Sequence, residues 1–165
     1  MHVTLEAATP ADAAEISRLR NQVAERLTRR HGKGHWSLTS TENGIRSTMK
    51  RSSVYVAWHD GRIVATLTLQ TKKPWAIDRS YFAEVGRPLY LLSMAVAADL
   101  HRQGIGRQCL DETRGIARRW PADAIFLDAY DADAGAGEFY RKCGFEQVGR
   151  ASYRGTPLIY YQLLL

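Results

Sequence analysis

Two glycines stand where an apolar run of the sequence meets a segment with helical spacing. Gly104 and Gly106 follow the apolar residues 89–97 and open a predicted helix over residues 104–120. A glycine turn at the start of a helix offers free backbone N–H groups and the positive end of the helix dipole, which together bind anions. A Walker-type loop is excluded because no Gly-Lys-Ser/Thr follows, and Cys109 stands where a dinucleotide fingerprint has its third glycine. The turn is predicted to bind a phosphorylated group.

Histidine and cysteine offer little further chemistry. His31 and His35 have the spacing of helical zinc ligands, but the glycines between them argue against a regular helix and no third ligand accompanies them. Cys109 and Cys143 are too few for a disulfide framework, and no His or Asn motif marks Cys143 as a nucleophile. We therefore predict no metal site and two free thiols.

Charge and hydropathy narrow the classes of partner. The net charge of +6 suits an anionic partner, but the basic residues are spread along the chain, and no zinc-finger or RNA-binding motif accompanies them. We interpret them as a solvated surface that helps attract a phosphorylated small molecule, without a nucleic-acid partner. No apolar stretch is long enough to cross a membrane, and the N-terminus lacks the pattern of a secretory signal, so a cytoplasmic location is expected.

The elements that must position the turn follow from periodicity and turn residues. Asp60-Gly61 predicts a tight hairpin, Thr41 is a candidate N-cap, and residues 72–88 form a long irregular segment. In the helix over residues 104–120, one face is expected to carry Ile105, Cys109, Ile116 and Trp120. The other expected helices cover residues 10–30, 41–51 and 134–142, and the expected strands cover residues 2–7, 53–59, 62–71, 89–97, 124–131, 145–152 and 158–164.

This order of elements mixes hairpins with helical crossovers. It predicts one α/β (α+β) domain over residues 1–165, with a mixed rather than purely parallel sheet.

A known family shares this order and two motifs. The turn His101-Arg-Gln-Gly-Ile-Gly106 and the segment Phe139-Tyr-Arg-Lys-Cys-Gly-Phe145 resemble those of the GNAT superfamily of acetyl-CoA-dependent N-acetyltransferases. The resemblance implies a single-domain fold whose mixed, mostly antiparallel sheet of about seven strands is flanked by about four helices. It also implies acetyl-CoA as co-substrate and a small-molecule or peptide amine as acceptor, and it leaves room for a homodimer.

The resemblance assigns cofactor contacts to two stretches and one further residue. In the family, the strand before the turn splays from its neighbour and pairs with the pantetheine arm, and the backbone N–H of Val96 would polarise the thioester carbonyl. His101 departs from the usual Arg or Gln, and Asp133 stands where the family often has Asn. The residues implied in cofactor binding are Met94, Ala95, Val96, His101, Arg102, Gln103, Gly104, Ile105, Gly106, Arg107, Asp133 and Tyr140.

The chemistry that the resemblance implies is direct attack of a neutral amine on the thioester within a ternary complex. Tyr140 is then the candidate acid for the leaving sulfur. The general base is not part of a motif, and Asp128, near the end of a central strand, is our first choice, with Glu84 second. For both Asp128 and Tyr140 a plain structural role is the alternative.

The acceptor pocket is expected beside two irregular regions, residues 28–40 and 72–88. Trp75 and Tyr81, with Glu84, are the candidate acceptor-binding residues, although Trp75, Tyr81 and Phe82 could equally cap the core. Two other functions stay open at this stage. One is a GNAT-like module that binds acyl-CoA without transferring the acyl group, and the other is a basic nucleic-acid-binding domain.

Overall fold

A β-hairpin forms where Asp60-Gly61 predicts one. In the computed structural model, which describes residues 1–165, β2 (Ser53–His59) and β3 (Arg62–Gln70) pair antiparallel around this turn. Asp60 and Gly61 both have positive φ angles, 48° and 72°, as a two-residue hairpin turn of type I′ requires. The short strand β1 (Leu5–Ala7) pairs antiparallel with β2. Side chains along β3 are buried without interruption from Ile63 to Leu69, so both faces of this strand are covered.

The chain folds into two units, each assembled from separate stretches of sequence. The first unit contains Met1–Leu69 and Ser93–Thr113, and the second contains Gln70–Leu92 and Arg114–Leu165. The strand β4 (Pro88–Val96) and the helix α3 (Ile105–Arg119) therefore each contribute residues to both units. Each unit is described by itself below.

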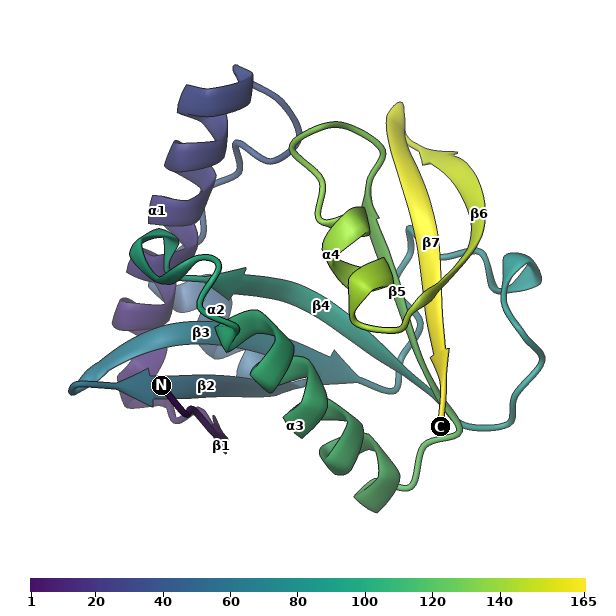
Figure 1. Cartoon of the computed structure of the whole chain (residues 1–165), viewed down its shortest axis with the longest axis horizontal. Coiled ribbons are helices and arrows are strands. Elements are labelled where there is room, and N and C mark those ends of the chain that lie inside the picture. The colour runs from purple at the N-terminus through teal and green to yellow at the C-terminus, as the bar shows by residue number, and fades with distance from the viewer. The chain divides into compact units, whose positions relative to one another are not determined.

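In the first unit, two helices accompany the hairpin. The helix α1 (Ala13–His31) follows a short 3-10 turn at Pro10–Asp12 and buries residues only in its N-terminal half, namely Ala13, Ile16 and Leu19. The helix α2 (Glu42–Met49) is capped as predicted, because the Thr41 hydroxyl accepts a hydrogen bond from the Gly44 N–H at 3.0 Å. Figure 1 shows α1 and α2 on the far side of β2 and β3.

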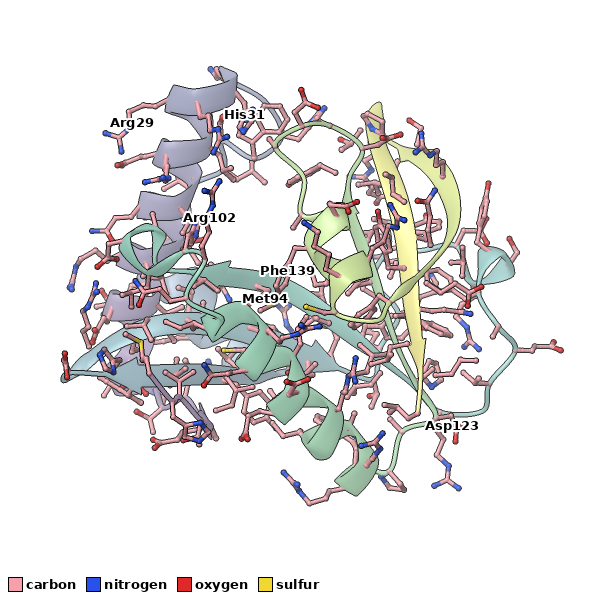
Figure 2. The ribbon with its side chains drawn as sticks, viewed as in Figure 1. Arg29, His31, Met94, Arg102, Asp123 and Phe139 are labelled. Atoms are coloured by element: carbon pink, nitrogen blue, oxygen red, sulfur yellow. The ribbon has the colours of Figure 1, made fainter.

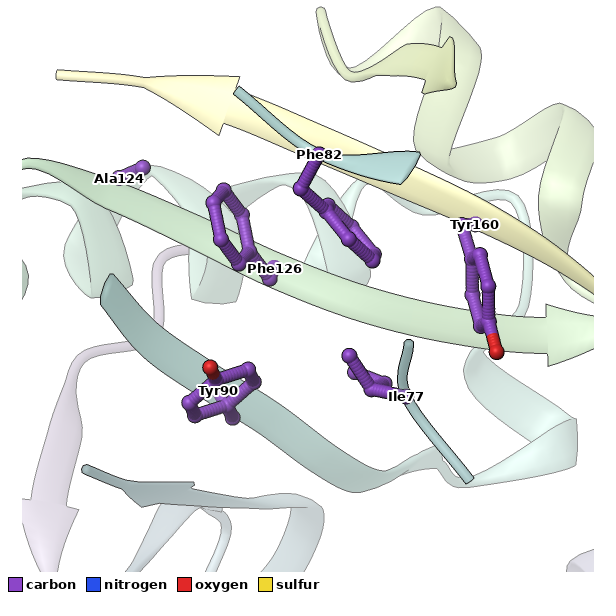
Figure 3. Close-up of a cluster of buried hydrophobic side chains, with 6 residues drawn as sticks. All are labelled: Ile77, Phe82, Tyr90, Ala124, Phe126 and Tyr160. Atoms are coloured by element: carbon purple, nitrogen blue, oxygen red, sulfur yellow. The ribbon is translucent and has the colours of Figure 1, made fainter. Parts of the chain in front are cut away.

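The second unit contains three strands, one helix and an aromatic cluster. The strand β5 (Ala124–Tyr130) pairs along its whole length with β7 (Thr156–Leu164), which pairs with β6 (Glu146–Tyr153). The helix α4 (Gly137–Lys142) ends at Gly144, whose φ of 93° is the left-handed conformation expected after a helix. Figure 3 shows the cluster, which is formed by Ile77, Phe82, Tyr90, Ala124, Phe126 and Tyr160.

The strand β4 has different partners along its length. Within the second unit it pairs parallel with β5 only from Pro88 to Tyr90, although β5 continues to Tyr130. Within the first unit, the N–H of Ala97, just after β4, donates to the Val64 carbonyl of β3 at 2.8 Å. The strand order is β1-β2-β3-β4-β5-β7-β6. The predicted mixed, mostly antiparallel sheet of seven strands with four α-helices is thus confirmed.

One predicted helix face is wrong at its end. Trp120 lies beyond α3 and is 36% exposed. Pro121 follows it, and the residue before a proline is disfavoured in the helical conformation, so the helix ends at Arg119. Ile105 and Cys109 are buried as expected, and the face continues through Leu110, Thr113 and Ala117. No helix of the structure is both long and apolar enough to span a membrane.

Candidate functional site

The turn between β4 and α3, in the first unit, has the backbone of an anion cradle. Arg102 and Gly104 have positive φ angles of 64° and 80°, and α3 begins directly afterwards at Ile105. The first N–H groups of a helix have no partner within it, so the N–H groups at this helix start are available to a ligand. A Cβ built on Gly104 would meet nothing closer than Gln108 Nε2 at 4.0 Å, which leaves the space in front of the turn open.

Side chains around this turn are mostly exposed. Arg102, Gln103 and Arg107 are exposed, whereas Ile105 is only 1% exposed and can serve a ligand through its backbone alone. Figure 2 labels Arg102 in this turn and Met94 on the strand before it. The turn therefore combines backbone donors with exposed positive charge, which favours an anion.

His101 links the turn to the end of β4. Its Nε2 lies 3.0 Å from the carbonyl oxygen of Val96. A carbonyl can only accept a hydrogen bond, so Nε2 must carry the proton and donate. The histidine that departs from the family's usual residue thus ties the turn to the strand predicted to contact the cofactor.

The last residues of β4 have a free side. Because the Ala97 N–H donates to β3, alternation along the strand directs the N–H of Val96 to the side away from β3. Met94 and Val96 are half-buried and Ala95 is buried. Ser93, within β4 and just before these residues, has a positive φ of 53°, a conformation uncommon for serine. Sequence reasoning missed this irregularity, and no local residue pattern indicates it.

Asp128, in the second unit, is a half-buried carboxylate without a hydrogen-bond partner in the protein. It lies on β5 directly opposite Tyr160 of β7. Burial raises the pKa of its carboxyl group, and no neighbouring cation counters this effect. A carboxylate with a raised pKa is a stronger base than an ordinary carboxylate and is suited to accept a proton.

Tyr140 is a buried phenol on α4. Its ring centroid lies 5.6 Å from Phe145 and 6.3 Å from Tyr161, and its hydroxyl makes no hydrogen bond. Burial raises the pKa of Tyr140, and the nearby Asp128 charge adds to the effect. The hydroxyl therefore stays protonated at neutral pH and can act as a donor. Gly137 allows α4 this close approach, because a Cβ there would overlap the Tyr161 hydroxyl.

Asp128 and Tyr140 approach opposite faces of the β5–β7 pair. Asp128 shares its face with Phe126 and Tyr160, which belong to the aromatic cluster, because side chains two residues apart on a strand and opposite pairs point the same way. Tyr140 packs near Tyr161, which points to the other face. The candidate base, Asp128, and the candidate acid, Tyr140, thus lie on opposite faces of the same two strands.

The candidate acceptor-binding residues lie on the segment before β4. The Tyr160 hydroxyl fixes this segment, since it donates to the Ala76 carbonyl at 2.5 Å and accepts from the Asp78 N–H at 3.2 Å. Phe82 is a core residue stacked on Phe126 at 4.4 Å, so for Phe82 the core interpretation is correct. Tyr81 is partly exposed and packs edge-on against Tyr160 at 5.3 Å.

Three other predicted residues are exposed. Trp75 is 83% exposed and does not cap the core, and Glu84 is exposed on the same segment. Asp133 is exposed in the turn before α4. Exposure leaves all three available to a ligand, but the structure gives none of them a fixed contact that would define a role.

A groove of about 520 Å³ lies in the first unit beside the C-terminal half of α1. One wall is α1, with Asn21 and Thr28, and the other is formed by Ser37 and Leu38. Figure 2 labels Arg29 and His31 at this end of the helix, and Arg29 lines the groove. The groove includes part of residues 28–40, one of the regions expected to flank an acceptor.

Comparison with known proteins identifies the family. The model of the Acetyltransferase (GNAT) family matches residues 18–145, which include both the turn and Tyr140. The chain belongs to the GNAT acetyltransferase family. The matched residues cover most of the chain and include residues of both units. Both motifs of this GNAT chain lie within them.

Solved structures share the GNAT fold. A GNAT-family acetyltransferase from Streptococcus agalactiae aligns with a TM-score of 0.78 and 15% identity over 99% of this chain and 95% of that one. The ribosomal-protein-alanine N-acetyltransferase of Brucella melitensis aligns with a TM-score of 0.72 and 21% identity over 98% and 99%. The Salmonella typhimurium protein yncA, solved with acetyl-CoA, gives 0.70 and 18% over 98% and 93%. At these identities the likeness concerns the fold.

A curated relative matches a shorter stretch. GCN5-related N-acetyltransferase 7, chloroplastic, of Arabidopsis thaliana is 33% identical over 58 residues. The matched stretch covers 35% of this chain and 21% of the length of that protein. The relative therefore supports membership of the family, and its own substrates do not transfer to this chain.

Proposed function

We propose that this GNAT chain transfers the acetyl group of acetyl-CoA to an amine acceptor. The observation that carries the proposal is the turn of the first unit, where Arg102 and Gly104 adopt left-handed conformations directly before the first turn of α3. Such a turn fits a pyrophosphate, since the space in front of Gly104 is open and Arg102 is exposed beside it. The acetyl-CoA complex of yncA supports the choice of ligand.

The first unit would hold the co-substrate mainly through its backbone. N–H groups from Gly104 to Arg107 would bind the pyrophosphate, and the strand residues Met94–Val96 would pair with the pantetheine arm. The N–H of Val96, on the side of β4 away from β3, would donate to the thioester carbonyl and polarise it. His101 keeps Val96 in place through its bond to the Val96 carbonyl. Bound acetyl-CoA supplies an acyl group already activated as a thioester.

The second unit would carry the proton transfers. An acceptor amine is protonated at neutral pH and must lose a proton before it can attack, and the Asp128 carboxylate, whose pKa burial raises, would accept that proton. The Tyr140 hydroxyl, kept protonated by burial, would donate a proton to the departing sulfur. Neither step forms a covalent bond to the protein, so transfer takes place directly between the two substrates.

Two measurements test the proposal. Titration calorimetry with acetyl-CoA should show saturable one-to-one binding, and acetyl-CoA mixed with a broad panel of small-molecule and peptide amines should release thiol at a rate that depends on the amine. Binding without amine-dependent thiol release across the panel would instead indicate a module that senses acyl-CoA. Failure to bind acetyl-CoA would contradict the assignment of the turn itself.

A further inference from the structure

Arg20 lies on the apolar stripe of α1. Apolar residues recur along this stripe at Ile16, Val23 and Leu27, and Arg20 occupies the position between Ile16 and Val23. Its side chain is largely buried, in contrast to the exposed Arg18 two residues earlier. A cation whose side chain is largely buried is costly, so a compensating interaction is expected.

The guanidinium of Arg20 lacks such compensation within the protein. Its Nη2 donates one long hydrogen bond, 3.4 Å, to the Thr68 hydroxyl of β3. Its Nε–H is buried and has no partner, and no carboxylate contacts the group. Burial lowers the pKa of Arg20, but a guanidinium stays charged in proteins. Nε–H and Nη2–H form one edge of the guanidinium plane, and this edge is the one left without an acceptor of opposite charge.

This edge lies beside the strand predicted to contact the co-substrate. The Ala97 N–H pairs with the Val64 carbonyl, and β3 and β4 run in opposite directions, as Figure 1 shows. By uniform antiparallel pairing counted from Ala97 and Val64, Thr68 of β3 would stand opposite the part of β4 around Ser93. Ser93 is the residue of β4 with a positive φ, directly before Met94. Arg20, through its contact with Thr68, therefore lies near the irregular part of β4.

We propose that Arg20 binds a carboxylate of the acceptor, so that the preferred acceptors are amines that also carry a carboxylate group. The proposal rests on the proposed acetyl transfer and adds a substrate class to it. A carboxylate presents two oxygen atoms to the two N–H groups of one guanidinium edge and balances its single charge. The Thr68 hydroxyl, held at 3.4 Å, is a weak partner that a carboxylate oxygen can replace.

Matched ligands test this assignment by binding rather than turnover. Calorimetry of the protein saturated with coenzyme A would compare each proteinogenic amino acid with its carboxamide, which keeps the amine and removes the negative charge. At least one amino acid should bind about 10-fold or more tightly than its amide, since a hydrogen-bonded charge pair contributes about 1.5–3 kcal/mol. Arg20→Met should abolish this preference, and Arg20→Lys, which keeps the charge without the fork, should reduce it.

Two control variants separate recognition from structure. Arg18→Gln removes an exposed cation from the same helix and should keep the preference. Thr68→Val removes the only side-chain partner of Arg20 and should also keep it, whereas a purely structural Arg20–Thr68 contact predicts equal damage from both partners. Thermal unfolding of each variant, with its affinity for acetyl-CoA, shows which variants are folded.

The outcomes distinguish this inference from the proposed function. Equal affinity for acids and amides, no binding of any amino acid, or a preference that survives in folded Arg20→Met would overturn the role of Arg20. Thiol release measured on the same panel is judged separately. A carboxylate preference without turnover would support the Arg20 site and contradict acetyl transfer. Turnover of uncharged amines without a carboxylate preference would support acetyl transfer and contradict the Arg20 site.

Discussion

The turn after β4 and the β5–β7 pair with α4 are two different kinds of candidate functional region. At the turn the chemistry belongs to the backbone, since the donors are N–H groups positioned by the left-handed Arg102 and Gly104, and the side chains nearby are exposed. On β5 and α4 the chemistry belongs to two side chains, the half-buried Asp128 and the buried Tyr140, whose pKa values burial raises.

The difference predicts how each half responds to substitution. A backbone site tolerates new side chains but not a new backbone conformation, so His101 can replace the usual residue of the motif while the turn keeps its shape. A side-chain site depends on single functional groups and on the burial that sets their pKa values. Substitutions of Asp128 and Tyr140 should therefore change rates, and substitutions in the turn should change affinity.

Loss of the Asp128 carboxylate should have the largest effect. Asp128→Asn keeps the size of the side chain and removes the base, and kcat should fall about 10³-fold, within the usual range for general base catalysis. Steady-state kinetics with acetyl-CoA held at saturation measures this change. Unchanged affinity for acetyl-CoA is the control, and a loss of less than about 3-fold in a folded variant would remove Asp128 from the mechanism.

The raised pKa of Asp128 also predicts two pH effects. Wild-type kcat/KM should rise with pH as the carboxyl group loses its proton, and this limb should be absent in Asp128→Asn. Because the folded-state pKa lies above the unfolded value, the protein is most stable below both values and loses stability as pH rises through the folded-state pKa. The melting temperature of Asp128→Asn relative to that of wild type should therefore increase from acid to neutral pH. A difference that stays constant with pH would contradict the assigned pKa shift.

Tyr140→Phe should have the next largest effect. It removes the hydroxyl and keeps the ring among Phe145 and Tyr161, so kcat should fall about 10²-fold while the dissociation constant for acetyl-CoA changes little. Tyr161→Phe removes a neighbouring buried hydroxyl and serves as the matched control, with activity near wild type. If both variants keep wild-type kcat while chemistry limits the rate, Tyr140 is not the acid.

Gly104→Val tests the backbone half of the comparison. The substitution adds a branched side chain in front of the turn and strains a φ of 80°, so affinity for acetyl-CoA should fall about 10-fold or more, while kcat at saturation stays near wild type. Gly155→Val is the control, because Gly155 has the same φ, 81°, and open surroundings in the turn between β6 and β7. Equal acetyl-CoA affinities in the two variants would show that Gly104 does not face the ligand.

The smallest expected effect concerns the segment before β4. Tyr81→Ala should raise the acceptor KM about 3- to 10-fold and leave acetyl-CoA affinity unchanged, because Tyr81 is partly exposed and contributes surface rather than a charged group. Trp75→Ala should act in the same direction. Gly149→Ala is a second test of Tyr81, because a Cβ at position 149 would overlap the Tyr81 ring and displace it. A change in acetyl-CoA affinity with an unaltered acceptor KM would contradict the assignment of this segment.

Much of the fold could be predicted because its signals are local. Asp60-Gly61 predicted the hairpin through a backbone conformation that few residue types adopt, and Thr41 predicted the start of α2 through its side-chain hydroxyl. The end of α3 was misplaced at Trp120 because helical spacing outweighed the effect of Pro121 in that prediction.

The features of the site that could not be predicted depend on contacts between distant residues. The positive φ of Ser93 has no local signal, and the bond from His101 to Val96 depends on how the turn folds back. The missing partners of Asp128 and Arg20 become visible only once packing is known. For Arg20 one signal was present, because an arginine at an apolar position of the α1 stripe departs from the pattern.

The most direct test of the account is a balance of products. The protein would be incubated with acetyl-CoA and the amine panel, and thiol release, acetylated amine and acetylated protein would be quantified together by absorbance and mass spectrometry. Direct transfer predicts one acetylated amine for each thiol released, with no acetyl group on the protein, and a rate that falls about 10³-fold in Asp128→Asn. An acetylated protein intermediate, or tight acetyl-CoA binding without any amine-dependent thiol release, would contradict it.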